Sequence, residues 1–186
     1  MKKFMLASVL FTILIAVLGS KCETHSVPYT SIIFLSKATF TGNFGGISNA
    51  DAICAAEATS AGLPGTYNAI LSSASVDAVQ RAPEAPFYTP TGLLIAASRS
   101  ALFTSSPALL NTVSVYADGT SPSGDYTIWT GSLATGYRTS FHCNSWTDNT
   151  LTGVTGVGNA TDYTWMYNSI LTCSVARNIY CMKVFN

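Results

Sequence analysis

The stretch that decides the fold is Ser48-Asn49-Ala50-Asp51-Ala52-Ile53-Cys54-Ala55-Ala56-Glu57-Ala58-Thr59-Ser60-Ala61-Gly62, because it predicts the one convincing helix of the chain. Ser48 with Asp51 three residues later forms a shortened capping box, and Gly62 stands where a glycine commonly ends a helix. Small residues recur at spacings of four, four and three and form one stripe, made of Ala50, Cys54, Ala58 and Ala61. This stripe lets the helix pack close to a sheet and turns its cysteine inward.

Strand patterns lie on both sides of this helix. Residues 31–36 are β-branched and apolar and predict a first, central strand, and residues 65–72 predict a buried strand. Residues 126–129 predict a strand that ends in a turn. Residues 178–185 alternate in polarity and predict the closing strand.

The remaining segments predict loops and short helices. A weak helix is expected over residues 75–80, and five prolines make long helices improbable from there to Trp129. The glycines at 153, 156 and 158 indicate a loop-rich crossover. The fold class is therefore α+β, in one domain with much irregular loop.

Composition excludes two broad classes of protein. Only 10% of the 186 residues are charged, whereas 48% are hydrophobic, so the chain has enough apolar surface to bury and disorder is excluded. The net charge is zero, so no electrostatic footprint for nucleic acid is present.

The first residues read as an export signal. Met1-Lys2-Lys3 is a basic start, and residues 4–18 carry no charge. This run is shorter than the roughly 20 apolar residues that a retained membrane helix needs. We expect a signal peptide over residues 1–21, a polar tether over 22–30 and a folded domain over 31–186.

The end of the signal resembles a relaxed lipobox, Leu18-Gly19-Ser20-Lys21-Cys22, in which the cysteine becomes the lipidated first residue. Ordinary cleavage after residue 19 or 20 is the alternative. The chain has five cysteines, and a lipid on Cys22 leaves four for two disulfides. Processing there leaves six basic and nine acidic residues, a net charge of −3.

A set of motifs runs through the mature chain. Asn49-Ala50-Asp51-Ala52-Ile53-Cys54 and Ala61-Gly62-Leu63-Pro64-Gly65-Thr66-Tyr67-Asn68-Ala69-Ile70-Leu71-Ser72-Ser73 are followed by Ile128-Trp129-Thr130-Gly131-Ser132, Cys143-Asn144-Ser145-Trp146 and, after Cys173, Ile179-Tyr180-Cys181. Together these motifs resemble endostatin, the C-terminal domain of collagens XV and XVIII. With the lipobox, the chain is most similar to the endostatin-like lipoproteins of Leptospira.

The resemblance implies a compact fold distantly related to C-type lectin domains, with two nested disulfides. Carried over from the family, these are Cys54–Cys181 and Cys143–Cys173, whereas spacing alone allows three pairings. Two endostatin features are missing. Its zinc site uses clustered histidines near the start of the domain, where this chain has only His25, and its heparin surface is an arginine cluster, whereas the arginines here are scattered. We expect no metal and no cofactor.

Few residues suggest chemistry. His142 and Cys143 are adjacent, so on a strand their side chains would point to opposite faces, and we expect no catalysis from them. Asp118, Asp125, Asp148 and Asp162 match no calcium-binding loop and read as solvated loop acids. Trp165 and Tyr167 lie in a polar stretch and are the candidate ligand-binding residues, with packing over the Cys173 bridge as the alternative.

These observations favour a non-enzymatic, lipid-anchored protein of the outer membrane or cell surface, with secretion or a periplasmic location as alternatives. The resemblance implies host extracellular-matrix or complement and plasma proteins as partners, with laminin, fibronectin, factor H and plasminogen as candidates. A lectin-like module that binds carbohydrate and a structural envelope lipoprotein without a ligand are the other hypotheses.

Overall fold

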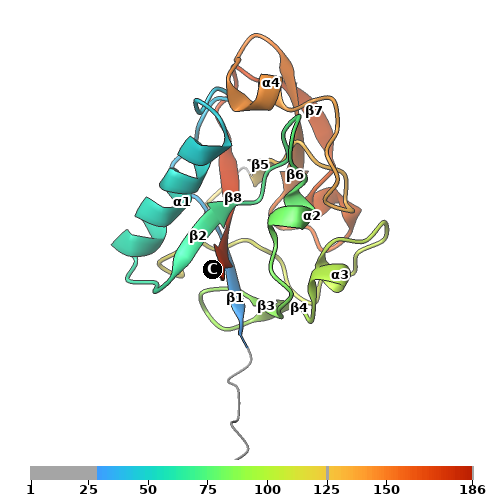
Figure 1. The fold of residues 1–186 in the computed structure, drawn as a ribbon. Helices are drawn as coiled ribbons and strands as arrows, with labels where there is room; N and C mark the ends of the chain where they lie inside the picture. Colours follow the sequence, from blue (N-terminus) through green and yellow to red (C-terminus); the bar gives the residue numbers. More distant parts are fainter. Residues whose placement is uncertain (1–28, 125, 186) are drawn as a thin grey trace, which may run out of the picture.

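The closing strand β8 (Asn178–Val184) is the centre of the sheet, because three other strands pair with it. Its middle pairs antiparallel with β1 (Ser31–Leu35), and its second half pairs antiparallel with β2 (Thr66–Ala69). Its beginning pairs parallel with β5 (Thr127–Trp129). The first and last strands of the fold therefore lie side by side, as Figure 1 shows.

The computed structural model describes residues 29–124 and 126–185. Its sheet has the strand order β4-β3-β1-β8-β5-β6-β7, with β2 paired to β8 beside this path. Among the described residues strands outnumber helices, and every helix except α1 is a single turn. The other elements are α1 (Ile47–Ser60), α2 (Ala78–Arg81), β3 (Phe87–Tyr88), β4 (Leu94–Ala96), α3 (Arg99–Leu102), α4 (Cys143–Trp146), β6 (Thr152–Val157), η1 (Tyr163–Trp165) and β7 (Ser169–Thr172).

Both faces of the central strands are buried. On β1, Phe34 faces one hydrophobic cluster, and Ile33 and Leu35 face the other, because successive side chains of a strand point to opposite faces. Strand β8 alternates in the same way. The mixed α+β class and the four predicted strands are confirmed, with slightly shorter bounds.

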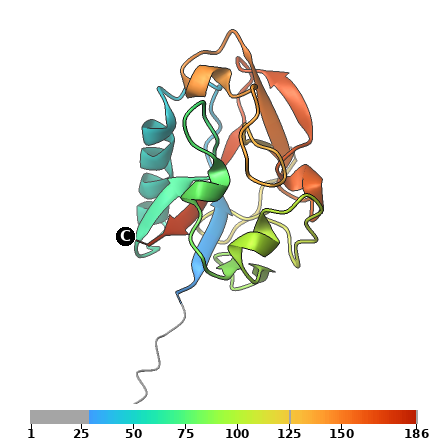
Figure 2. The ribbon, with the colours of Figure 1, turned by 45° about the vertical axis from the view of Figure 1, so that its right-hand side comes forward.

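Helix α1 covers one face of the sheet beside β2 and β8 (Figure 2). Ala50, Cys54 and Ala58 are buried against it, which confirms most of the predicted small-residue stripe. The helix ends at Ser60, and Gly62 is the predicted glycine after it: its φ of 73° turns the chain so that the amide of Leu63 bonds the carbonyl of Ala58 at 2.9 Å.

The capping box predicted for Ser48 and Asp51 is wrong. The residue before the helix is Gly46, and no side chain caps the first turn. The Asp51 carboxylate instead accepts the amide of Ala69 at 2.8 Å and pairs with Arg81. The Asp51 carboxylate, which the local pattern predicted to cap the start of the helix, therefore takes part in a long-range ion pair instead.

The crossover predicted at the three late glycines is also wrong, because two of them belong to strand β6 and the third follows it directly. A Cβ on Gly156 would lie 1.9 Å from the backbone oxygen of Trp165, and one on Gly153 would lie 2.8 Å from the Cys143 sulfur. Glycine is needed here for close approach of neighbouring chain, which is its usual meaning inside a strand.

Element α4 is a left-handed turn. Its four residues, none of them glycine, have φ values of 52°, 51°, 58° and 69°. Such conformations cost roughly 1–2 kcal/mol per residue, so surrounding contacts must hold them. The indole of Trp146 donates to the Ser72 carbonyl at 2.8 Å, and the carbonyl of Trp146 accepts the amides of Gly45 and Gly46. The turn thus fastens the beginning of α1.

Two disulfides close the fold. Cys54–Cys181 ties α1 to β8 across 127 residues, and Cys143–Cys173 ties α4 to the end of β7 across 30 residues. These are the pairs that the endostatin resemblance implies. Closing loops of these lengths stabilises a fold by about 5 and about 3.5 kcal/mol in the chain-entropy model.

The predicted signal peptide and nearly all of the predicted tether lie outside the described residues. Within the described ranges, no helix has the length and apolarity to cross a bilayer.

Candidate functional site

An open groove of about 490 Å³ lies between the C-terminal half of α1 and the loop that contains residues 116–118. Residues 37 and 38, which follow β1, form its third side. This volume falls within the range of roughly 300–1,000 Å³ that is typical of small-molecule and cofactor sites. The groove is therefore the candidate functional site.

The backbone of the third side is held by Glu57 of α1. Its two carboxylate oxygens accept the amides of Lys37 at 2.7 Å and Ala38 at 3.2 Å. The loop on the far side is held to the sheet, because the amide of Leu35 donates to the Val115 carbonyl at 2.8 Å. The first wall is thus fixed by the Glu57 side chain and the second by a backbone hydrogen bond, and neither depends on the side chains of Lys37 or Asp118.

The two carboxylate oxygens of Asp118 bind different groups. Its Oδ1 accepts the amide of Thr120 at 3.0 Å and the hydroxyl at 2.6 Å, a local turn typical of Asp followed by Thr. Its Oδ2 contacts the Nζ of Lys37 at 2.8 Å. The hydrogen bonds from Lys37 and then Thr120 hold the pKa of this carboxyl well below its ordinary value.

Lys37 lies over an aromatic ring as well as beside a carboxylate. Its Nζ is 5.7 Å from the centroid of the Tyr116 ring, within the range of cation–π attraction. The hydrogen bond to Asp118 raises the pKa of Lys37. Because the lysine stays an ammonium and the aspartate stays a carboxylate at neutral pH, neither group is tuned for proton transfer. The groove is suited to binding.

The groove carries more negative than positive charge. Its lining contains one cationic side chain, Lys37, and two carboxylates, those of Glu57 and Asp118. The C-terminal end of α1 also lines the groove, through Ser60 and Ala61, and adds the partial negative charge of a helix end. The site therefore favours a cation.

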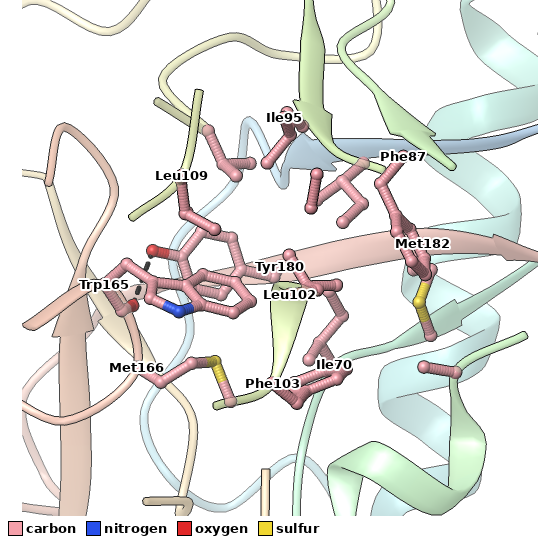
Figure 3. Close-up of a cluster of buried hydrophobic side chains, with 14 of the residues drawn as sticks. Ile70, Phe87, Ile95, Leu102, Phe103, Leu109, Trp165, Met166, Tyr180 and Met182 are labelled. Carbon is pink, nitrogen blue, oxygen red and sulfur yellow. Dashed lines mark hydrogen bonds between the residues drawn. The ribbon is translucent and has the colours of Figure 1, made fainter. Parts of the chain in front are cut away.

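Trp165, predicted as an exposed anchor, is fully buried, so that prediction is wrong (Figure 3). Its ring packs against Phe103 and Tyr180, with ring centroids 5.8 and 5.4 Å apart. The 3₁₀ turn η1 turns the tryptophan inward and leaves Tyr163 half exposed. Tyr167 is half-buried. The predicted pair therefore does not form one exposed surface.

The other candidate residues are scattered. His142 accepts the amide of Ser145 through Nδ1 at 2.9 Å, and Cys143 is in a disulfide. Asp148 and Asp162 bond Thr150 and Thr164 two residues later. Cys22, His25 and Asp125 lie outside the described residues. No group of metal-ligating side chains gathers within residues 29–124 and 126–185.

Sequence reasoning missed Lys37, Glu57 and Tyr116 as site residues. One local signal was available, because the tripeptide Asp118-Gly119-Thr120 predicts the turn that fixes one carboxylate oxygen.

Comparison with known proteins places the chain in a family whose function is unknown. A family model described as "Protein of unknown function (DUF1554)" matches residues 37–163, more than half of the chain. The chain therefore belongs to this family. No curated protein matches the chain. The matched stretch includes every residue of the groove that is described above.

Proposed function

We propose that the chain is a non-enzymatic, lipid-anchored protein of the cell surface that binds host extracellular-matrix or complement and plasma proteins. The observation that carries the proposal is the groove beside α1, in which fixed walls surround an aromatic ring and an exposed ion pair. Such a surface is suited to holding a partner's side chain.

Export supports this proposal. Disulfides form and persist in oxidising compartments, and the fold contains two of them. The basic start and uncharged stretch of residues 1–18 are typical of a secretory signal. Cys22 at the end of that signal is the proposed lipid attachment site.

We also propose kinship with the endostatin-like lipoproteins and, more distantly, with C-type lectin domains. The support is the order of the four cysteines and their pairing in two nested disulfides. Their positions against one helix and a mixed sheet agree with this kinship.

A binding assay tests the function. The full chain should bind at least one of immobilised laminin, fibronectin, factor H or plasminogen saturably. Asp118→Asn should weaken that binding, whereas Asp148→Asn, which alters the same kind of turn elsewhere, should not. Absence of binding to all four proteins contradicts the proposal, and calcium-dependent retention on glycans would favour the lectin-like alternative.

The lipid anchor has its own test. Metabolic labelling with a palmitate analogue should mark the wild type and not Cys22→Ser. Equal labelling of the two would contradict the anchor and leave the binding assay unaffected.

A further inference from the structure

We propose that the groove receives a basic side chain, preferably arginine, of a protein partner, and that Lys37 occupies the same position when the partner is absent. The inference rests on the proposed binding function and names the chemistry of the partner.

The position of Lys37 shows where a cation is stable in the groove. Its ammonium lies 2.8 Å from Asp118 Oδ2 and 5.7 Å from the centroid of the Tyr116 ring. A carboxylate beside an aromatic face attracts ammonium and guanidinium groups alike. Guanidinium also stacks on aromatic rings and bonds a carboxylate through two N–H groups, so an arginine should bind more tightly than a lysine.

The acceptors are fixed before any partner arrives. Thr120 holds Asp118 through Oδ1, which leaves Oδ2 facing the lysine. Glu57 is held by the amides of residues 37 and 38. A partner's cation therefore meets oriented oxygens, which lowers the entropic cost of binding.

Lys37 can leave without unfolding the groove. Its side chain is 63% exposed, and the bonds that fix the loop come from its backbone amide. The groove wall next to it is made of alanines, Ala38, Ala61 and Ala117, against which the aliphatic stem of an entering side chain can lie. The groove would then keep two carboxylates and gain one cation from outside.

The test uses small probes with the full chain, followed by NMR titration. N-acetyl-arginine amide is the ligand, and N-acetyl-citrulline amide is its uncharged match. Lys37→Ala should bind the arginine probe about tenfold more tightly than the wild type, if Lys37 leaves the groove about one-tenth of the time. Lys183→Ala removes the same charge away from the groove and should bind as the wild type does.

Asp118→Asn, made together with Lys37→Ala, should abolish the gain, whereas Asp148→Asn made with Lys37→Ala should retain it. Equal binding of arginine and citrulline, or no gain in Lys37→Ala, overturns the inference. So does wild-type binding of N-acetyl-glutamate amide that Lys37→Ala abolishes, which would assign an acidic partner. Arginine binding in a protein that binds no host protein would refute the proposed function and leave the groove's specificity standing.

Discussion

Replacement of Trp165 by alanine tests whether the indole is buried in the core, as the structure shows, or exposed for binding, as its polar sequence neighbours suggest. The indole is fully buried among Phe103, Tyr180 and Met166 (Figure 3). The backbone carbonyl of Trp165 accepts a hydrogen bond from the hydroxyl of Tyr180 at 2.8 Å, and the substitution leaves this bond in place. The change therefore removes packing and opens a cavity without removing a backbone contact.

The expected cost is about 3–5 kcal/mol, the usual range for deletion of a large buried aromatic side chain. That is a large part of the roughly 5–15 kcal/mol by which folded proteins are stable. For a chain of this size the melting temperature should fall by roughly 6–20 °C.

Trp165→Phe should cost much less. The indole Nε1 is buried and has no acceptor among the described residues. A buried donor without a partner costs about 1–3 kcal/mol, so its removal offsets part of the lost volume. Phenylalanine keeps a ring against Phe103 and Tyr180.

The assay is urea unfolding followed by far-UV circular dichroism, because the chain contains two other tryptophans, Trp129 and Trp146, that would confuse fluorescence. Tyr163→Ala is the matched control: it lies in the same 3₁₀ turn, is 52% exposed and should change stability by less than about 0.5 kcal/mol. If Trp165→Ala is as stable as this control, the burial argument is wrong.

Three further predictions follow from the fold. Gly156→Ala should destabilise the chain by about 3 kcal/mol, the upper end of the usual overpacking cost, in urea unfolding, because the new Cβ would meet the backbone of Trp165 and not a movable side chain. Thiol counting in denaturant without reductant should find none of the four bridged cysteines reactive, and two or more free thiols would contradict the pairing. Hydrogen bonds lower the pKa of the carboxyls of Asp118, Asp148 and Asp162, so their contribution to stability is present above about pH 4 and is lost as the pH falls. A variant with asparagine at all three positions should lose less stability between about pH 5 and about pH 2 than the wild type.

The sequence predicted what depends on local periodicity. The small-residue stripe of α1 and its glycine end needed only the 3.6-residue repeat and the conformational freedom of Gly62. The alternating pattern of residues 178–185 likewise predicted β8. In these elements the buried face is the one that the hydrophobic pattern of the element itself predicts.

Long-range contacts decided the elements that the sequence misplaced. Gly156 looked like a loop residue because glycine weakens strands, but the neighbouring backbone of Trp165 leaves no room for a side chain there. Trp165 looked exposed because its neighbours are polar. The same turn in which Asp162 bonds Thr164 brings the indole into the core. Neither contact has a signature within a short window of sequence.

The geometry of the groove depends both on a local sequence motif and on long-range contacts. The chain contains four Asp-x-Thr tripeptides. In the three that begin at Asp118, Asp148 and Asp162 the carboxylate accepts the amide of the threonine, and the fourth begins at Asp125, outside the described residues. The local motif therefore predicts a fixed carboxylate at four places, and the structure describes three of them. Of the three that the structure describes, only Asp118 pairs with a lysine, because the strand β1 that precedes Lys37 forms a bridge with Tyr116 and brings the two loops together. The site thus depends on sheet topology. Related chains that keep the groove should have a basic residue two positions after the first strand together with a Tyr-x-Asp-x-Thr sequence in the distant loop.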